Sequence, residues 1–85
     1  GTQMIELECF VEFKHDVEWT TSKMTRENMV FETMAINPAY VAWLRRSTIA
    51  GHDFCEVHMA DRGGNYVFTK TYEEMRALLL DEAPK

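Results

Sequence analysis

Apolar and polar residues alternate most regularly at the start of the chain, from Met4 to Phe13. A period of two places every second side chain on the same face of a strand. The pattern therefore predicts a half-buried strand, with glutamates on its outer face and Phe10 as the one large apolar residue among them. The inward positions are Ile5, Leu7, Cys9, Val11 and Phe13.

Two further segments before residue 38 have strand character. Residues 17–21 continue the alternation after a turn at His15-Asp16, which predicts a second strand and a hairpin. Residues 28–37 are apolar on both faces and carry a single acid, Glu32. We expect a central strand there, covered on both sides, although a helix fits the same run.

The middle of the chain is the most ambiguous part. Asn37-Pro38 indicates a turn, because the residue before a proline is biased away from helix. The pattern of residues 40–46 predicts a short strand, and one helical turn that begins at Pro38 fits directly before it. Residues 47–53, which include Gly51, predict a loop.

Alternation returns at residues 54–60, with Glu56 and His58 outward and Phe54 at the edge. Residues 61–65 are dense in turn formers, so residues 66–70 are expected to return as the second strand of a hairpin. The inward residues of the first strand are Cys55, Val57 and Met59.

The C-terminal part carries a helix signal. Thr71 and Glu74 have the spacing of a capping box, in which each side chain binds the other residue's backbone amide. Met75, Leu78 and Leu79 then recur on one helical face. We therefore predict an α+β domain over residues 4–80, with about five or six antiparallel strands and one C-terminal helix packed on the sheet. Residues 1–3 are expected to be an expression remnant or a disordered start, and residues 81–85 a frayed tail.

Composition narrows the function classes. The chain has 85 residues, a net charge of −5 and no apolar run near the roughly 18 residues of a membrane span. This length fits one domain, and this charge excludes a strongly basic nucleic-acid footprint for the chain as a whole. Two cysteines, Cys9 and Cys55, favour reduced thiols in a cytoplasmic protein over a disulfide framework.

Charge is spread unevenly, because residues 21–50 are mildly basic and both ends are acidic. Tyr40 and Trp43 lie among these bases, and aromatic residues beside arginines can hold single-stranded nucleic acid. This is the alternative function, although the acidic strands nearby oppose it. The basic residues of this alternative patch are Lys23, Arg26, Arg45, Arg46 and Arg62.

Catalytic and metal-binding motifs are weak in this sequence. His52, Cys55 and His58 carry zinc-ligand side chains, but an odd spacing along a strand turns Cys55 and His58 to opposite faces. No nucleophile elbow or phosphate-binding loop is recognisable. We therefore expect no metal, no cofactor and no enzymatic activity.

Apolar residues at positions that cannot all be internal point instead to a protein interface. We expect a small non-enzymatic regulatory or accessory module that binds a protein partner, most simply a second copy in a homodimer. The residues predicted to form the interface are Phe10, Phe31, Tyr40 and Trp43.

One pattern runs through residues 36–47, 55–61 and 66–75 taken together. It consists of an Asn-Pro turn, an apolar strand, a hairpin and a strand that leads into a capped helix. Over residues 36–78 the chain resembles the small bacterial flagellar and swarming-motility proteins of the FlbD-like type. The first strands of LytTR-type DNA-binding domains are similar in rhythm. The motility resemblance implies a fold of this kind and no catalytic residues.

Overall fold

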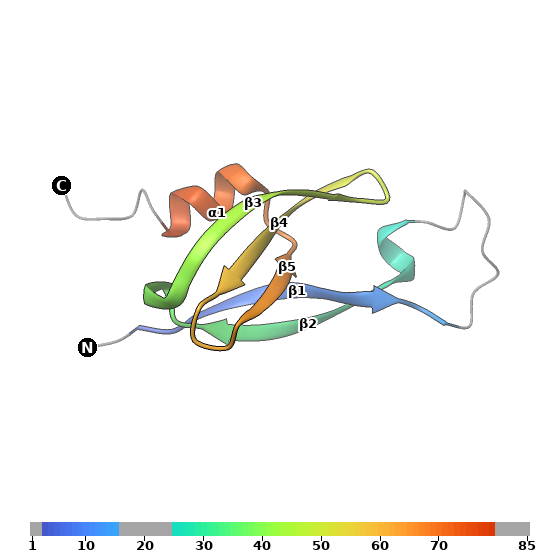
Figure 1. The fold of residues 1–85 in the computed structure, drawn as a ribbon. Coiled ribbons are helices and arrows are strands. Elements are labelled where there is room, and N and C mark those ends of the chain that lie inside the picture. Colours follow the sequence, from blue (N-terminus) through green and yellow to red (C-terminus); the bar gives the residue numbers. More distant parts are fainter. Residues whose placement is uncertain (1–2, 16–24, 80–85) are drawn as a thin grey trace.

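The structure, a computed structural model, describes residues 3–15 and 25–79. The strand expected over residues 17–21 lies outside these residues. Figure 1 shows the described elements, which are five strands, two short 3-10 helices and one α-helix. In chain order they are β1 (Ile5–Phe13), η2 (Arg26–Asn28), β2 (Met29–Ile36), η3 (Pro38–Tyr40), β3 (Val41–Ile49), β4 (His52–Met59), β5 (Gly64–Phe68) and α1 (Tyr72–Leu79).

The strands form one antiparallel sheet in the order β2-β1-β5-β4-β3, and α1 packs against β3 and β4. The predicted α+β class is therefore confirmed. The central position expected for residues 28–37 is wrong, because β2 is an edge strand. Its buried side chains are the terminal Met29 and Ile36, and between them Glu32 and Thr33 are exposed.

The sheet is strongly bent, because its two edge strands follow each other in the chain. Only residues 37–40 join β2 to β3. A fully extended linker of this length spans about 18 Å, whereas a flat five-stranded sheet is about 19 Å wide. The linker is not extended, since it forms η3, so the sheet must coil to bring the two edges together. Asn37 Oδ1 accepts from the Ala39 amide at 2.9 Å, and the Tyr40 carbonyl accepts from the Ala60 amide at 2.8 Å.

The core lies between the sheet and α1, on what we call the helix face. Met75 of α1 is fully buried there, in one cluster with buried residues of strands β1, β2, β4 and β5. The predicted capping box is present, because the Thr71 amide donates to Glu74 at 2.8 Å and the Glu74 amide donates to Thr71 Oγ1 at 3.1 Å. The strand residues of this core are Leu7, Cys9, Ile36, Cys55, Val57, Met59 and Phe68.

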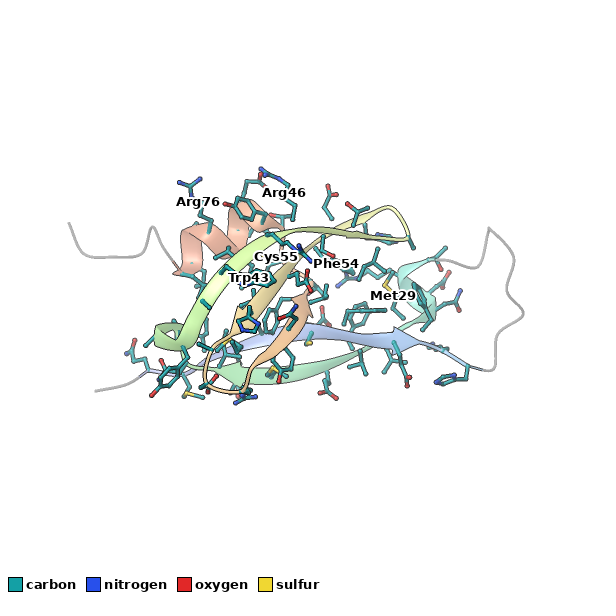
Figure 2. All side chains as sticks on the ribbon, viewed as in Figure 1. Met29, Trp43, Arg46, Phe54, Cys55 and Arg76 are labelled. Atoms are coloured by element: carbon teal, nitrogen blue, oxygen red, sulfur yellow. The ribbon has the colours of Figure 1, made fainter. Side chains whose placement is uncertain are left out.

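A second apolar cluster lies on the opposite side of the sheet, which we call the open face because α1 does not cover it. Phe54 is only 2% exposed, so the edge position expected for it is wrong. Its ring lies 6.4 Å from that of Phe10, which lies opposite Phe31 across the β1–β2 pair. The Arg26 guanidinium covers the cluster, 4.7 Å from the Phe31 ring centre. Figure 2 shows Phe54 and Met29 between the β3–β4 and β1–β2 hairpins.

The loop expected over residues 47–53 is also wrong, because β3 and β4 continue through most of it. Ile49 lies opposite His52, which leaves a two-residue turn of Ala50 and Gly51. Both have positive φ, 51° and 81°, as a type I′ hairpin turn requires. Residues 47–53 resemble a loop in the sequence because an edge strand such as β3 needs few apolar residues.

Replacement of Ala50 by asparagine should stabilise the fold by about 1 kcal/mol, because asparagine tolerates the left-handed region that costs alanine roughly 1–2 kcal/mol. Urea unfolding followed by circular dichroism measures this change. Ala50→Val is the matched control at the same site and should lower stability, since a β-branched residue fits this region poorly. Equal or lower stability of Ala50→Asn would contradict the turn geometry.

Candidate interaction surface

Strand β3 forms an unpaired edge of the sheet, and none of its nine residues is buried. Trp43 is 39% exposed on this strand, and Tyr40 is 48% exposed in η3, just before it. The inner side of β3 pairs with β4, with a register shift between Val41 and Trp43. From Trp43 to Ile49 the pairing is regular. The outer side of β3 therefore presents backbone groups that no described strand pairs with.

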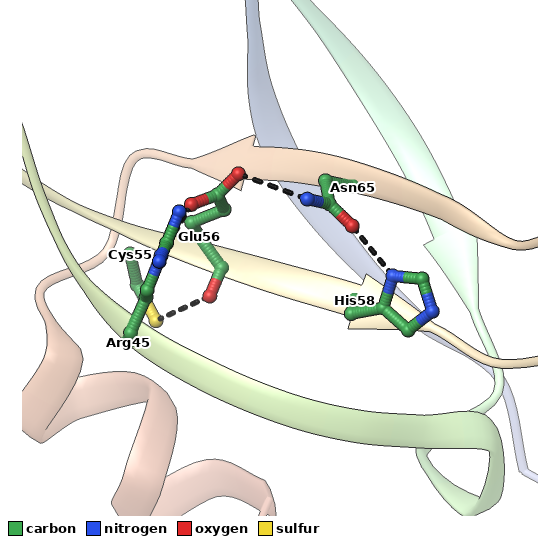
Figure 3. Close-up of polar contacts among 5 residues, drawn as sticks. All are labelled: Arg45, Cys55, Glu56, His58 and Asn65. Atoms are coloured by element: carbon green, nitrogen blue, oxygen red, sulfur yellow. Dashed lines mark hydrogen bonds and ion pairs between the residues drawn. The ribbon is translucent and has the colours of Figure 1, made fainter.

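A closed network of five side chains, which we call the β3–β5 network, covers the open face next to this edge. Arg45 Nε donates to Glu56 Oε1 at 2.7 Å, and Asn65 Nδ2 donates to Glu56 Oε2 at 3.2 Å. Asn65 Oδ1 meets His58 Nδ1, and Figure 3 shows these polar contacts. The His58 ring stacks on Trp43 at 5.4 Å between centres, and the Arg45 guanidinium lies 5.2 Å from the Trp43 ring centre.

The orientation of the Asn65 amide gives His58 Nδ1 a defined hydrogen-bonding role in this network. The Asn65 amide nitrogen donates to Glu56, so its oxygen is the acceptor that faces His58. In this arrangement Nδ1 of His58 is therefore the donor to Asn65 Oδ1. Asn65 joins β5 to β4 in this arrangement through its contacts with Glu56 and His58.

Sequence reasoning missed Glu56, His58 and Asn65 as members of one surface. Glu56 and His58 could be placed outward from their alternation, but their partners depend on strand register. His58 lies opposite Trp43 and Asn65, and Glu56 lies opposite Arg45. The one available signal in the sequence was the opposite charge of Arg45 and Glu56, which lie on strands that follow each other in the chain.

The arginines of the predicted nucleic-acid patch do not converge, and each lies beside an acid. Arg26 contacts Glu8 at 2.9 Å on the far side of the sheet from β3. Arg45 and Arg46 lie on opposite faces of β3, where Arg46 contacts Glu73 of α1 and covers the Tyr72 ring at 4.6 Å. Arg62 lies 3.8 Å from Asp61 in the β4–β5 turn, and Lys23 lies outside the described residues.

The four predicted interface residues occupy two separate places. Phe10 and Phe31 lie together in the aromatic cluster under Arg26, and both are half-buried. Tyr40 and Trp43 lie at the start of β3 and are exposed. The chain itself therefore covers part of the first pair, while the second pair remains available to a partner.

A cleft of about 200 Å³ lies on the other face of the same region, between β3, β4 and the start of α1. Arg46 and Glu73 line it and are paired with each other. The hydrogen bond from its own backbone amide, and then the contact with Arg46, hold the pKa of Glu73 below its usual range. The remaining lining residues are Ser47, Thr48, Asp53, Phe54, Thr71 and Tyr72.

The two thiols are structural. Cys9 and Cys55 are buried on either side of Phe68 in the core. Burial raises the pKa of Cys9, and it raises the pKa of Cys55 to about 11. Cys55 faces the core and His58 the open face, as their odd spacing predicts. Within residues 3–15 and 25–79, no group of three or more His, Cys, Asp or Glu side chains is arranged to hold a metal ion.

Comparisons of the chain with protein-family models, with curated proteins and with solved structures find no match. The resemblance to FlbD-like and LytTR-type proteins therefore stays a prediction. None of the helices in the described part of the chain is long and apolar enough to cross a membrane. The geometry of the surface itself must carry the functional argument.

Stability should fall at alkaline pH because the folded chain holds the Cys55 proton more tightly than the unfolded chain does. The thiol pKa is 9.0 without burial and about 11 in the fold. Between these two values the unfolded state binds fewer protons, so the free energy of unfolding decreases as pH rises. Urea unfolding from pH 8 to pH 11, about the range of the two pKa values, measures the slope. Cys55→Ala should have a shallower slope, and an unchanged slope would contradict the assignment.

Single-stranded DNA should not bind, because Arg45 and Arg46 are neutralised by Glu56 and Glu73. Fluorescence anisotropy of a labelled oligonucleotide at low salt, with protein up to about 50 μM, tests a range in which nonspecific binders are detected. Glu56→Gln is the test variant, because it removes the ion-pair partner of Arg45. Glu27→Gln is its control, because it makes the same charge change at an exposed site in η2. Binding by the unchanged chain that Arg45→Glu abolishes would revive the nucleic-acid alternative.

Proposed function

We propose that this chain is a non-enzymatic interaction module that self-associates through the β3 edge of its sheet. The observation that carries the proposal is the state of β3, a nine-residue edge strand with no buried side chain and with an exposed tryptophan. Unpaired edge strands are templates for pairing with another chain. Exposed tryptophans are also enriched among residues that dominate binding energy.

The behaviour of the two β3 arginines supports this assignment. Charged residues commonly protect edge strands by projecting into the space that a partner strand would occupy. Here Arg45 turns inward over β4 to Glu56, and Arg46 turns inward under the sheet to Glu73 of α1. Both charges are matched within the chain, so they place no unbalanced charge at the edge.

The arrangement of reactive groups supports a non-enzymatic role. A nucleophile must lie within hydrogen-bond reach of a base. Both cysteines are buried with raised pKa values, and their thiols donate to the backbone carbonyls of Phe10 and Glu56. His15 contacts Glu12 on the surface, and His52 stacks on Phe54. The carboxylates that form ion pairs within the described part of the chain contact arginines or His15.

Self-association is tested by native mass spectrometry and by sedimentation equilibrium over a range of protein concentrations. We expect a dimer that Trp43→Ser weakens by about 2 kcal/mol or more, which is roughly thirtyfold in the dissociation constant. The reason is that Trp43 is the largest side chain exposed on β3.

The matched control is Val11→Ser, because Val11 is also exposed but lies on β1, away from the β3 edge. It should leave the dimer unchanged. Circular dichroism confirms that both variants are folded. A chain that stays monomeric at every concentration would refute the proposal, and equal weakening by both variants would refute the role of β3.

A further inference from the structure

The β3–β5 network is complementary to itself along the outer edge of β3, and this property selects one register of pairing. The inference rests on the self-association proposed above and adds the geometry of the assembly. A dimer with two-fold symmetry places identical strands side by side in antiparallel orientation. The residue on the symmetry axis then decides which side chains face each other across the interface.

Charge excludes two of the possible registers. With Arg45 on the axis, the two Arg45 side chains would lie directly opposite each other on the open face. With Arg46 on the axis, the same repulsion would arise on the helix face. Like charges directly opposite each other destabilise a sheet. The axis must therefore pass through a neighbouring residue.

Two arginine-free positions close to the middle of the strand are Leu44 and Ser47. An axis through Leu44 places Trp43 inside the paired segment, next to the register shift between Val41 and Trp43. An axis through Ser47 overlaps residues 45–49 of β3 and leaves Trp43 outside the paired segment. Because aromatic side chains contribute strongly to cross-strand pairs, the Leu44 register has the larger side-chain gain.

We propose that two copies pair through antiparallel β3 strands with Leu44 on the two-fold axis, so that Trp43 lies opposite the partner's Arg45. Each chain already contains the contacts that this pairing repeats. Within one chain His58 stacks on Trp43, Arg45 covers Trp43, and Arg45 contacts Glu56. Across the interface the order becomes His58, Trp43, the partner's Arg45 and the partner's Glu56.

In this order a ring stack within one copy is followed by a cation–π contact across the interface and then by an ion pair within the partner. The symmetry axis generates a second, identical row. Each Arg45 keeps its own Glu56, so the cation that approaches the partner's tryptophan is already charge-balanced. On the helix face the two Leu44 side chains meet at the axis, next to the cores that they already contact.

The opposite edge, β2, fits a second copy less well. Glu32 lies at its centre, opposite Cys9 and therefore on the side of the sheet that carries the core. A charged side chain at that place is a known protection of edge strands. Pairing of β3 with the partner's β2 would also fail to close and would give open-ended polymers.

The register is read by a scan of single cysteines along β3. Leu44→Cys, Ser47→Cys and Thr48→Cys are each oxidised under mild conditions, and the covalent dimer is measured on non-reducing gels. Directly opposite residues have Cβ atoms about 5 Å apart, within the range that a disulfide needs after small adjustment. The unchanged chain is the background control, because Cys9 and Cys55 are buried.

We expect Leu44→Cys to form covalent dimer at least tenfold faster than Ser47→Cys and Thr48→Cys. Fastest reaction of Ser47→Cys would overturn the register. No cross-link at any of the three positions, in a chain that mass spectrometry shows to be dimeric, would overturn the β3 interface and leave self-association standing. A monomer at all concentrations would overturn the proposed function and this inference together.

Because Leu44 contacts the core, a second measurement avoids that residue. A spin label on Thr48→Cys, which is exposed, reports the distance between two copies. In the Leu44 register the two labels are offset by eight residues along the strand, about 27 Å. In the Ser47 register they are offset by two residues, about 7–8 Å apart. A short distance would therefore overturn the proposal even where Leu44→Cys fails to fold.

Discussion

The four residues between β2 and β3 impose the constraint on which the rest of this fold depends. They join the two edges of a five-stranded sheet, so the sheet must coil until those edges meet at one end. The β1–β2 pair then joins the other three strands through a short stretch of strand pairing, Cys9–Phe68 and Phe10–Val67, which the hydrogen bond from the Thr69 amide to the Glu8 carbonyl extends. This narrow seam lets the hairpin lean over the open face, where Phe10 approaches Phe54.

The coiled sheet explains why the molecule has two apolar clusters. On the helix face, Met75 of α1 belongs to one buried cluster with residues from strands on both sides of the seam. The open face is not covered by α1, and the Arg26 guanidinium lies there over Phe31 and within 5.8 Å of the Phe54 ring centre. The β3–β5 network lies on the same face next to the β3 edge, and there Trp43 remains exposed.

Local signals in the sequence identified most of the described elements, but not which elements lie next to each other in the sheet. The alternation of β1 and the spacing of Thr71 and Glu74 identified a strand and a helix start, because both depend on nearby residues. The edge position of β2 could not be inferred from the segment itself. In the sequence Phe31 gives this segment a second apolar face, whereas in the structure the Arg26 side chain covers the Phe31 ring. The role of Asn65 depended on the register of the β4–β5 hairpin, which no pattern of apolar residues specifies.

The β3 arginines connect stability to the proposed function. Arg46 ties the edge strand to α1 through Glu73 and Tyr72, while Arg45 ties it to β4 through Glu56. Exposed ion pairs of this kind add little to folding, typically less than about 1 kcal/mol. Their larger effect is on orientation, since each pair restricts a long cationic side chain to one position. In the proposed dimer, an Arg45 side chain restricted in this way stacks on the partner's Trp43 with less loss of side-chain entropy than a free arginine. In that proposed dimer, the contacts that hold β3 in its own sheet also serve the pairing of its outer edge.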